Sequence, residues 1–296
     1  MAATSTTPLP RHYAGVCRLE DFSDPELAAL MDDISPEKPA SRPHRKAWEF
    51  AMGASYLQAT GLLDGTKEIL DVGAGSEEIA FWLAARARSV TAVDIYGRGA
   101  FGTREAKASM LEDPASFAPY DYPQDRLTVR DMDARKLEFP DASFDAVVSF
   151  SSIEHFGGFA GIKASAAEIG RVLRPGGRAF LVTETFVKRH PMDTVGVQVA
   201  IRTLSLNRKC TGADFKHRST EVLSSAELQR LIVKPSGLTL EQPLQLKPSP
   251  ATLTNLHTVQ PDGTTTSATG DPFPHVLVSN GYSTFTSVCL PLVKPG

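Results

Sequence analysis

The stretch "EILDVGAGSEEIAFWLAARARSVTAVDIYG", residues 68–97, decides the fold of this chain. An apolar run is followed by a turn with two glycines, a helical pattern and a second apolar run that ends in Asp94. This order is typical of a β-strand, a turn, an α-helix and a second strand parallel to the first. Glycines in such a turn let the backbone approach a ligand, and an acid that closes the next strand can accept hydrogen bonds from a ribose. The stretch therefore predicts a nucleoside site at the carboxyl ends of the strands.

Strand and helix patterns alternate through most of the remaining chain. The strands are predicted at 68–72, 89–95, 126–134, 143–150, 178–184, 238–244 and 282–293. The helices are predicted at 24–34, 42–63, 77–87, 163–173 and 223–233, the last with Ser224 and Glu227 spaced as a capping box. Continuous rather than alternating apolar runs indicate strands that are covered on both faces, as in a parallel sheet with right-handed crossovers.

Composition narrows the class of protein. The 296 residues are 42% hydrophobic and 22% charged, with a formal net charge of -3, which is ordinary for a globular protein. No basic field exists to attract nucleic acid or a membrane surface, and no apolar stretch is long enough to span a bilayer. Cys17, Cys210 and Cys289 show no metal-binding spacing and are expected as reduced thiols. With no signal-peptide pattern at the start, a cytoplasmic location is expected.

A dinucleotide cofactor is the first alternative for the glycine turn. Its fingerprint needs a third glycine so that strand and helix pack closely around a pyrophosphate. Here Gly73 and Gly75 are followed at that place by Glu78, with Glu77 beside it. Two carboxylates at the start of the helix would repel a pyrophosphate, which disfavours an NAD(P)-dependent oxidoreductase.

Four ordered blocks resemble the class I S-adenosylmethionine (SAM) dependent methyltransferases. "ILDVGAGSE" is similar to motif I of that family, and Asp94 to its ribose-binding acid. "DMDARKLEFPDASFDAVVSFSSIEHF" (131–156) and "EIGRVLRPGGRAFLVTE" resemble two later blocks, so that the match covers about 68–184. The resemblance implies a doubly wound, Rossmann-like α/β fold. Its seven-stranded mixed sheet would have an antiparallel last strand, and SAM would be the cofactor.

The resemblance also implies a role for each matching position in SAM binding. Asp71, Gly73 and Gly75 would hold the methionine part and Asp94 the ribose, with Ile95 as an apolar wall for the adenine. The remaining expected contacts are Asp133 with Ala134 at the adenine edge (Asp131 is the alternative acid), and the backbone of Phe150 and Ser151 beside the sulfonium.

The candidate catalytic residues are His155 and Glu154, just after the fourth strand of the match. Histidine titrates near neutral pH and suits proton abstraction from an acceptor; a purely structural histidine is the alternative. Glu154 could orient His155 or face solvent. Some relatives hold Mg²⁺ with an E-x-x-E-H cluster and a later histidine, for which His190 would be the candidate. Ser151 replaces the first glutamate of that cluster, so no metal is expected.

Two parts outside the match are expected to select the acceptor. Residues 1–67 are predicted as an N-terminal arm and helical lid, in which His44, Arg45 and Trp48 could close over the cofactor. For Trp48, which lies on an apolar helix stripe, a place in the core is the alternative. Residues 68–296 form the predicted SAM-binding domain, with substrate-binding insertions at about 185–222 and 245–281. The first insertion region is basic and could face either an acidic acceptor or solvent. Its charged residues are Lys188, Arg189, Arg208, Lys209, Lys216 and Arg218.

The sequence thus predicts methyl transfer to a small-molecule or sugar-like acceptor, most simply at a hydroxyl. Methylation of nitrogen or carbon stays open. An oxidoreductase and a non-catalytic nucleoside-binding protein are the alternatives from other classes.

Overall fold

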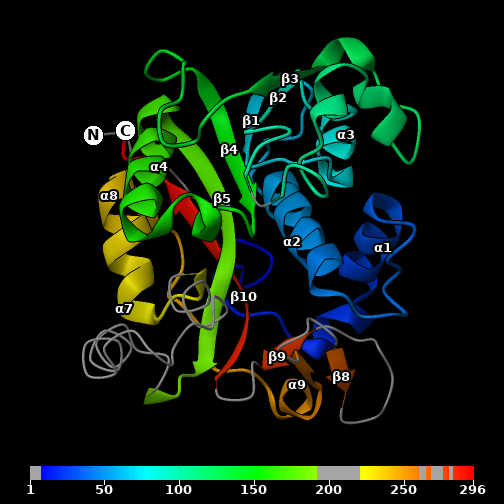
Figure 1. The fold of residues 1–296 in the computed structure, drawn as a ribbon, viewed down its shortest axis with the longest axis vertical. Coiled ribbons are helices and arrows are strands. Elements are labelled where there is room, and N and C mark those ends of the chain that lie inside the picture. The colour runs from blue at the N-terminus through cyan, green and yellow to red at the C-terminus, as the bar shows by residue number, and fades with distance from the viewer. Residues whose placement is uncertain (1–7, 100, 192–220, 260–264, 268–275, 280–282) are drawn as a thin grey trace, which may run out of the picture.

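The computed structural model describes residues 8–99, 101–191, 221–259, 265–267, 276–279 and 283–296. One sheet runs through the middle of the molecule with helices on both of its faces (Figure 1). None of the helices within the described ranges has the length and apolar character that a membrane crossing requires.

The described residues form one sheet of 10 strands, in the order β3-β2-β1-β4-β5-β10-β9-β7-β8, with β6 paired to β10. The strands are β1 (Glu68–Val72), β2 (Ser89–Asp94), β3 (Leu127–Asp131), β4 (Phe144–Phe150), β5 (Leu173–Lys188), β6 (Thr239–Leu240), β7 (Leu256–Val259), β8 (Thr265–Ser267), β9 (Leu277–Ser279) and β10 (Thr284–Val293). The first five are parallel to one another, and β10 is antiparallel to β5.

The predicted fold class is confirmed, but the predicted number of strands is wrong. Each of the seven predicted runs contains a strand, and the run at the chain end is antiparallel as expected. The additional strands β7, β8 and β9 lie within 245–281, which shows no apolar periodicity of its own. They extend the sheet because β9 pairs with the first residues of β10 and β7 with β9. Backbone pairing with an existing edge needs no sequence pattern, so composition alone could not predict it.

Each of the five predicted helix ranges contains a helix. The helices are α1 (Pro25–Ile34), α2 (Arg45–Ala59), α3 (Glu78–Ala84), α4 (Gly158–Val172), α7 (Ser225–Leu228), α8 (Lys234–Ser236) and α9 (Pro250–Thr254). However, α4 begins five residues before the predicted start at 163, and α9 was not predicted. Asp24 caps α1 by accepting from the backbone N–H of Glu26 and Leu27. The capping box of Ser224 and Glu227 at α7 is present as predicted.

Two apolar cores lie on opposite faces of the sheet, which is why the strand sequences are continuously apolar. One core joins α1, α2 and α3 to the sheet and includes Trp48, Phe81 and Phe180. The other joins α4 and the α7–α8 region to the opposite face and includes Ile162 and Leu231. In Figure 1 these two helix groups stand on either side of the strands.

The N-terminal segment is built into this structure. Val16 forms a bridge with Val288 of β10, and Gly15 with Gln245. All residues of α2 from Ala47 to Leu57 are buried. Cys17 and Cys289 are buried and unbonded to each other, and Cys210 lies outside the described residues. A division of function between 1–67 and 68–296 stays a prediction.

The order of the strands reverses at one point of the sheet. The chain runs from β1 through β2 to β3 on one side, then returns to β4 on the other side of β1. Ligands of open α/β sheets bind at the carboxyl ends of the strands where the order reverses in this way. For this chain that point lies between β1 and β4.

Candidate functional site

Asp71 lies at the carboxyl end of β1, beside this reversal. Its side chain is 1% exposed, and neither carboxylate oxygen has a hydrogen-bond partner among the described residues. Burial raises the pKa of Asp71 well above its ordinary value, and the nearby Glu77 raises it further. An unpaired buried carboxylate is costly, so this position calls for a cationic or hydrogen-bond-donating ligand.

The turn after Asp71 needs its glycines. Gly73 has φ +72° and Gly75 φ +52°, in the left-handed region that favours glycine. A Cβ atom on Gly73 would lie 2.5 Å from the Cβ of Ser152, and one on Gly75 would lie 2.8 Å from the carbonyl oxygen of Glu105. Close packing of protein groups, in addition to any ligand, therefore excludes side chains here.

Asp94 ends β2 and is tied to the same turn. Its carboxylate accepts hydrogen bonds from the backbone N–H of Gly75 at 2.9 Å and of Ile95 at 2.7 Å. Burial raises the pKa of Asp94, while these two N–H donors hold it down in part. Ile95 is 37% exposed, as an apolar wall for a ligand would be. The structure thus brings together Asp71, the two glycines and Asp94, as the sequence predicts.

Unlike Asp71, the two acids at the end of β3, Asp131 and Asp133, already have ion-pair partners. Asp133 is bonded by the guanidinium of Arg135 through three contacts, which lower the pKa of this carboxyl. Asp131 forms an ion pair with Arg98. Ala134 is 7% exposed. Both candidate acids for the adenine edge are therefore already paired with arginines, and their role stays a prediction.

The turn after β4 carries Phe150 and Ser151. Ser151 has φ +48°, an unusual conformation for a residue with a side chain. Its hydroxyl donates to the carboxylate of Glu49 at 2.8 Å, and the hydroxyl of Ser287 in β10 donates to the same oxygen. Glu49 is 1% exposed and comes from α2, so a distant helix and strand hold the turn in place.

Lys46 is a functional candidate that the sequence analysis missed. Its ammonium donates to the carbonyl oxygen of Phe150 at 2.8 Å and forms an ion pair with Glu77 at 2.8 Å. Burial opposes its charge, but Glu77 and Glu49 together raise the pKa of Lys46. Burial raises the pKa of Glu77 to about 7, although Lys46 opposes this. The only signal in the sequence was its place near the start of an amphipathic helix, which does not show where its tip lies.

Glu154 and His155 lie in the short helix η5 (Ile153–His155). Glu154 is 1% exposed, and neither of its carboxylate oxygens has a hydrogen-bond partner in the described part of the chain. Burial raises the pKa of Glu154 to about 7. The acid closest to the His155 imidazole is instead Glu221, whose Oε1 lies 3.5 Å from Nδ1. Burial alone would lower the pKa of His155, but the carboxylates of Glu221 and Glu154 raise it above 6.5.

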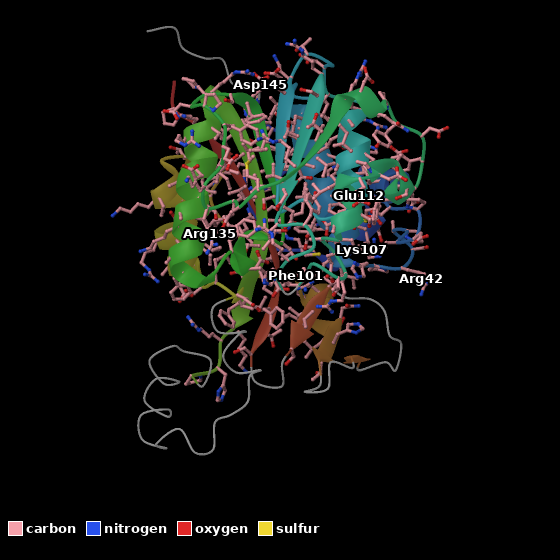
Figure 2. The ribbon with its side chains drawn as sticks, turned by 45° about the horizontal axis from the view of Figure 1, so that its top comes forward. Arg42, Phe101, Lys107, Glu112, Arg135 and Asp145 are labelled. Carbon is pink, nitrogen blue, oxygen red and sulfur yellow. The ribbon has the colours of Figure 1, made fainter. Side chains whose placement is uncertain are left out.

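The segment between β2 and β3 covers the carboxyl ends of the strands, and no sequence pattern predicted this. The hydroxyl of Tyr96 donates to the carbonyl of Gly75 at 2.9 Å, and the backbone N–H of Ser76 to that of Glu105 at 2.8 Å. The Phe101 ring lies against the His155 ring, with centroids 4.8 Å apart. Figure 2 shows Phe101 toward the carboxyl ends of the strands, with Asp145 of β4 at the opposite end of the sheet.

The remaining residues of the sequence analysis either pack within the protein or lie outside the described residues. Trp48 is 1% exposed and donates from Nε1 to Asp21 at 2.7 Å, as a core residue does. Arg45 pairs with Glu184 of β5, and His44 caps α2. Residues 192–220 lie outside the described part, including Arg208, Lys209, Lys216 and Arg218. Within the described residues, no group of three or more His, Cys, Asp or Glu side chains could hold a metal ion.

Comparison with known proteins identifies the central segment. Residues 70–181 match the family model described as "Methyltransferase domain". The chain is 33% identical over 132 residues to the S-adenosyl-L-methionine-dependent Diels-Alderase iccD of Talaromyces variabilis, covering 44% of this chain and 39% of that protein. It is 36% identical over 113 residues to the 27-O-demethylrifamycin SV methyltransferase of Amycolatopsis mediterranei, covering 38% of this chain and 37% of that protein. The chain thus aligns with less than two fifths of either relative.

Solved structures give a weaker likeness. The YcgJ protein from Bacillus subtilis has 17% identity and a TM-score of 0.46, with 81% of this chain and 97% of that chain covered. The match of 70–181 spans β1 to β5, the strands that carry Asp71, Asp94 and the β4 turn. By this match, residues 70–181 form a methyltransferase domain, as the resemblance in the sequence predicts.

Proposed function

We propose that this chain is a SAM-dependent methyltransferase that acts on a small-molecule acceptor, with a hydroxyl oxygen as the methylated atom. The observation that carries the proposal is the buried, unpaired carboxylate of Asp71 beside the β1–β4 reversal, next to the Gly73–Gly75 turn that Asp94 fixes. The methionine part of SAM offers an ammonium group, which an isolated buried carboxylate requires.

The residues present fit this cofactor better than a dinucleotide. Glu77 at the start of α3 and Asp71 would both oppose a pyrophosphate. Asp94 keeps acceptor capacity for ribose hydroxyls beyond its two backbone donors, because a carboxylate has about four lone-pair sites. Bound SAM supplies an electrophilic methyl group, and positioning of the acceptor supplies most of the rate.

His155 is the proposed base for a hydroxyl acceptor. Glu221 contacts Nδ1, which would hold the Nδ1–H tautomer and leave Nε2 as the proton acceptor. The Phe101 ring packs against the imidazole at an interplanar angle of 53° and limits its motion. Glu154, unpaired and buried one residue earlier, would stabilise the imidazolium that forms after proton transfer. The relative named a 27-O-demethylrifamycin SV methyltransferase supports an oxygen acceptor.

The test is ligand binding followed by turnover. Calorimetry with SAM and, separately, with NAD should give binding for SAM alone. A panel of hydroxylated metabolites with methyl-labelled SAM should then give labelled product and an equal amount of S-adenosylhomocysteine. Binding of NAD with no binding of SAM would overturn the proposal, and label on nitrogen or carbon would correct the acceptor atom.

A second candidate is a cyclase that binds SAM without using its methyl group. The Diels-Alderase relative is what favours it, because a Diels-Alder reaction forms two carbon–carbon bonds and transfers no methyl. The same assay separates the two functions. Conversion of a polyene substrate in the presence of SAM with no S-adenosylhomocysteine would support the cyclase.

A further inference from the structure

We propose that Lys46 is the ligand for the carboxylate of the cofactor's methionine part, so that α2 completes a cofactor site whose other proposed contacts lie within 70–181. This inference rests on the proposed function, because it concerns how SAM is held. The assignment begins with the charges around the β1–β4 reversal. Asp71 and the carbonyl oxygen of Phe150 are acceptors there and suit an ammonium.

The anionic end of the ligand needs a different partner. Glu77 stands at the start of α3, where an anion would otherwise be favoured by the helix N–H groups. Its side chain and that of Glu49 would repel a carboxylate. Lys46 is the cation in contact with both, at 2.8 Å from Glu77 and 3.7 Å from Glu49.

The Lys46 ammonium has one N–H donor left for a further acceptor. An ammonium has three N–H donors. Phe150 and Glu77 lie at hydrogen-bond distance from Nζ. Oε2 of Glu49 lies beyond that distance and accepts no hydrogen bond within the described residues. A ligand carboxylate at this place would take the third donor and offset the repulsion from the two glutamates.

The position of Lys46 is fixed before any ligand binds. It is the second residue of α2, whose next eleven residues are all buried. The Lys46 ammonium lies 5.6 Å from the centroid of the Phe50 ring, on the same helix. The helix therefore delivers a preorganised cation to the end of β4, and little side-chain entropy remains to be lost on binding.

The experiment compares SAM with decarboxylated SAM, which keeps the sulfonium and the amine and lacks only the carboxylate. Calorimetry on the full chain should show SAM bound about 10- to 100-fold more tightly than decarboxylated SAM, the range of a hydrogen bond to a charged group. In Lys46→Met this preference should fall to near one, with the affinity for decarboxylated SAM retained. Lys38→Met is the matched control, because Lys38 pairs at 2.6 Å with Glu78, which follows Glu77 in the first turn of α3. This variant should leave the preference for SAM unchanged.

The outcomes separate this inference from the proposed function. A wild-type protein that binds SAM and decarboxylated SAM equally would overturn the role of Lys46 alone, as would a preference that survives in Lys46→Met. A wild-type protein that binds neither compound would overturn both proposals. If Lys46→Met melts early, Lys46→Gln keeps an N–H donor for the Phe150 carbonyl without the charge, and it should lose the preference in the same way.

Discussion

The two turns that line the candidate site are held in different ways. The β1 turn, Asp71 to Gly75, is tied locally: Gly75 bonds to Asp94 of the next strand, and Gly73 to the carbonyl of Val93. The β4 turn, Phe150 to His155, is tied by side chains from remote elements. Glu49 and Lys46 reach it from α2, and Glu221 reaches it from a position just before α7 in the chain.

This difference shows which contacts a short sequence motif can encode and which contacts depend on the tertiary structure. A turn fixed by its own glycines and the neighbouring strand can be encoded in some 30 consecutive residues, as residues 68–97 show. A turn that holds Ser151 at φ +48° needs a buried acceptor brought from another element. We expect the β1 turn to govern cofactor affinity and the β4 turn to govern turnover.

His155→Ala should give the largest effect and tests the β4 turn. Loss of a general base costs about 10²- to 10⁴-fold, so kcat should fall by that factor while the affinity for SAM stays the same. The neutral imidazole is the form that accepts a proton, and its pKa is raised above 6.5. The rate should therefore fall as the pH drops through a value above 6.5. Glu221→Gln should shift this acidic limb of the pH–rate profile to lower pH. Full turnover by His155→Ala would make the residue structural.

Gly73→Ala comes next and tests the β1 turn. A side chain would be strained at φ +72° and would meet Ser152 at 2.5 Å, which together should cost about 2–4 kcal/mol of unfolding free energy. Gly61→Ala is the matched control, because Gly61 has φ +69° with open space around it. It should cost about 1–2 kcal/mol from strain alone. Equal losses in urea unfolding would remove the close approach as a cause.

Asp94→Ala should weaken SAM binding by about 1–3 kcal/mol, the scale of a hydrogen bond to a charged group. Calorimetry measures this loss directly. A melting curve close to that of the wild type would show that the turn survives without the Gly75 and Ile95 contacts. Unchanged affinity would remove Asp94 from the site.

Asp133→Ala should give the smallest effect and sharpens the comparison from outside both turns. Its carboxylate is already bonded by Arg135 and is 40% exposed, so we expect a loss of SAM affinity below about 1 kcal/mol. A loss as large as that for Asp94→Ala would show that the cofactor displaces Arg135 and that the adenine edge is a full part of the site.

The sequence by itself determined the parallel core and the β1 turn. The apolar runs of β1, β2, β4 and β5 allow no other burial than between two helix layers. The glycines of the β1 turn and Asp94 are close in sequence, so their contact follows from the strand–turn–helix order alone.

Only the tertiary structure decided the rest. The contacts of Lys46 with Phe150, of Glu49 with Ser151 and Ser287, and of Glu221 with His155 each join residues far apart along the chain. Strands β7 and β9 likewise depend on the edge that β10 offers. The physical reason is the same in each case: a local pattern sets the backbone of its own segment, whereas the partner of a buried charge is set by which element packs against it.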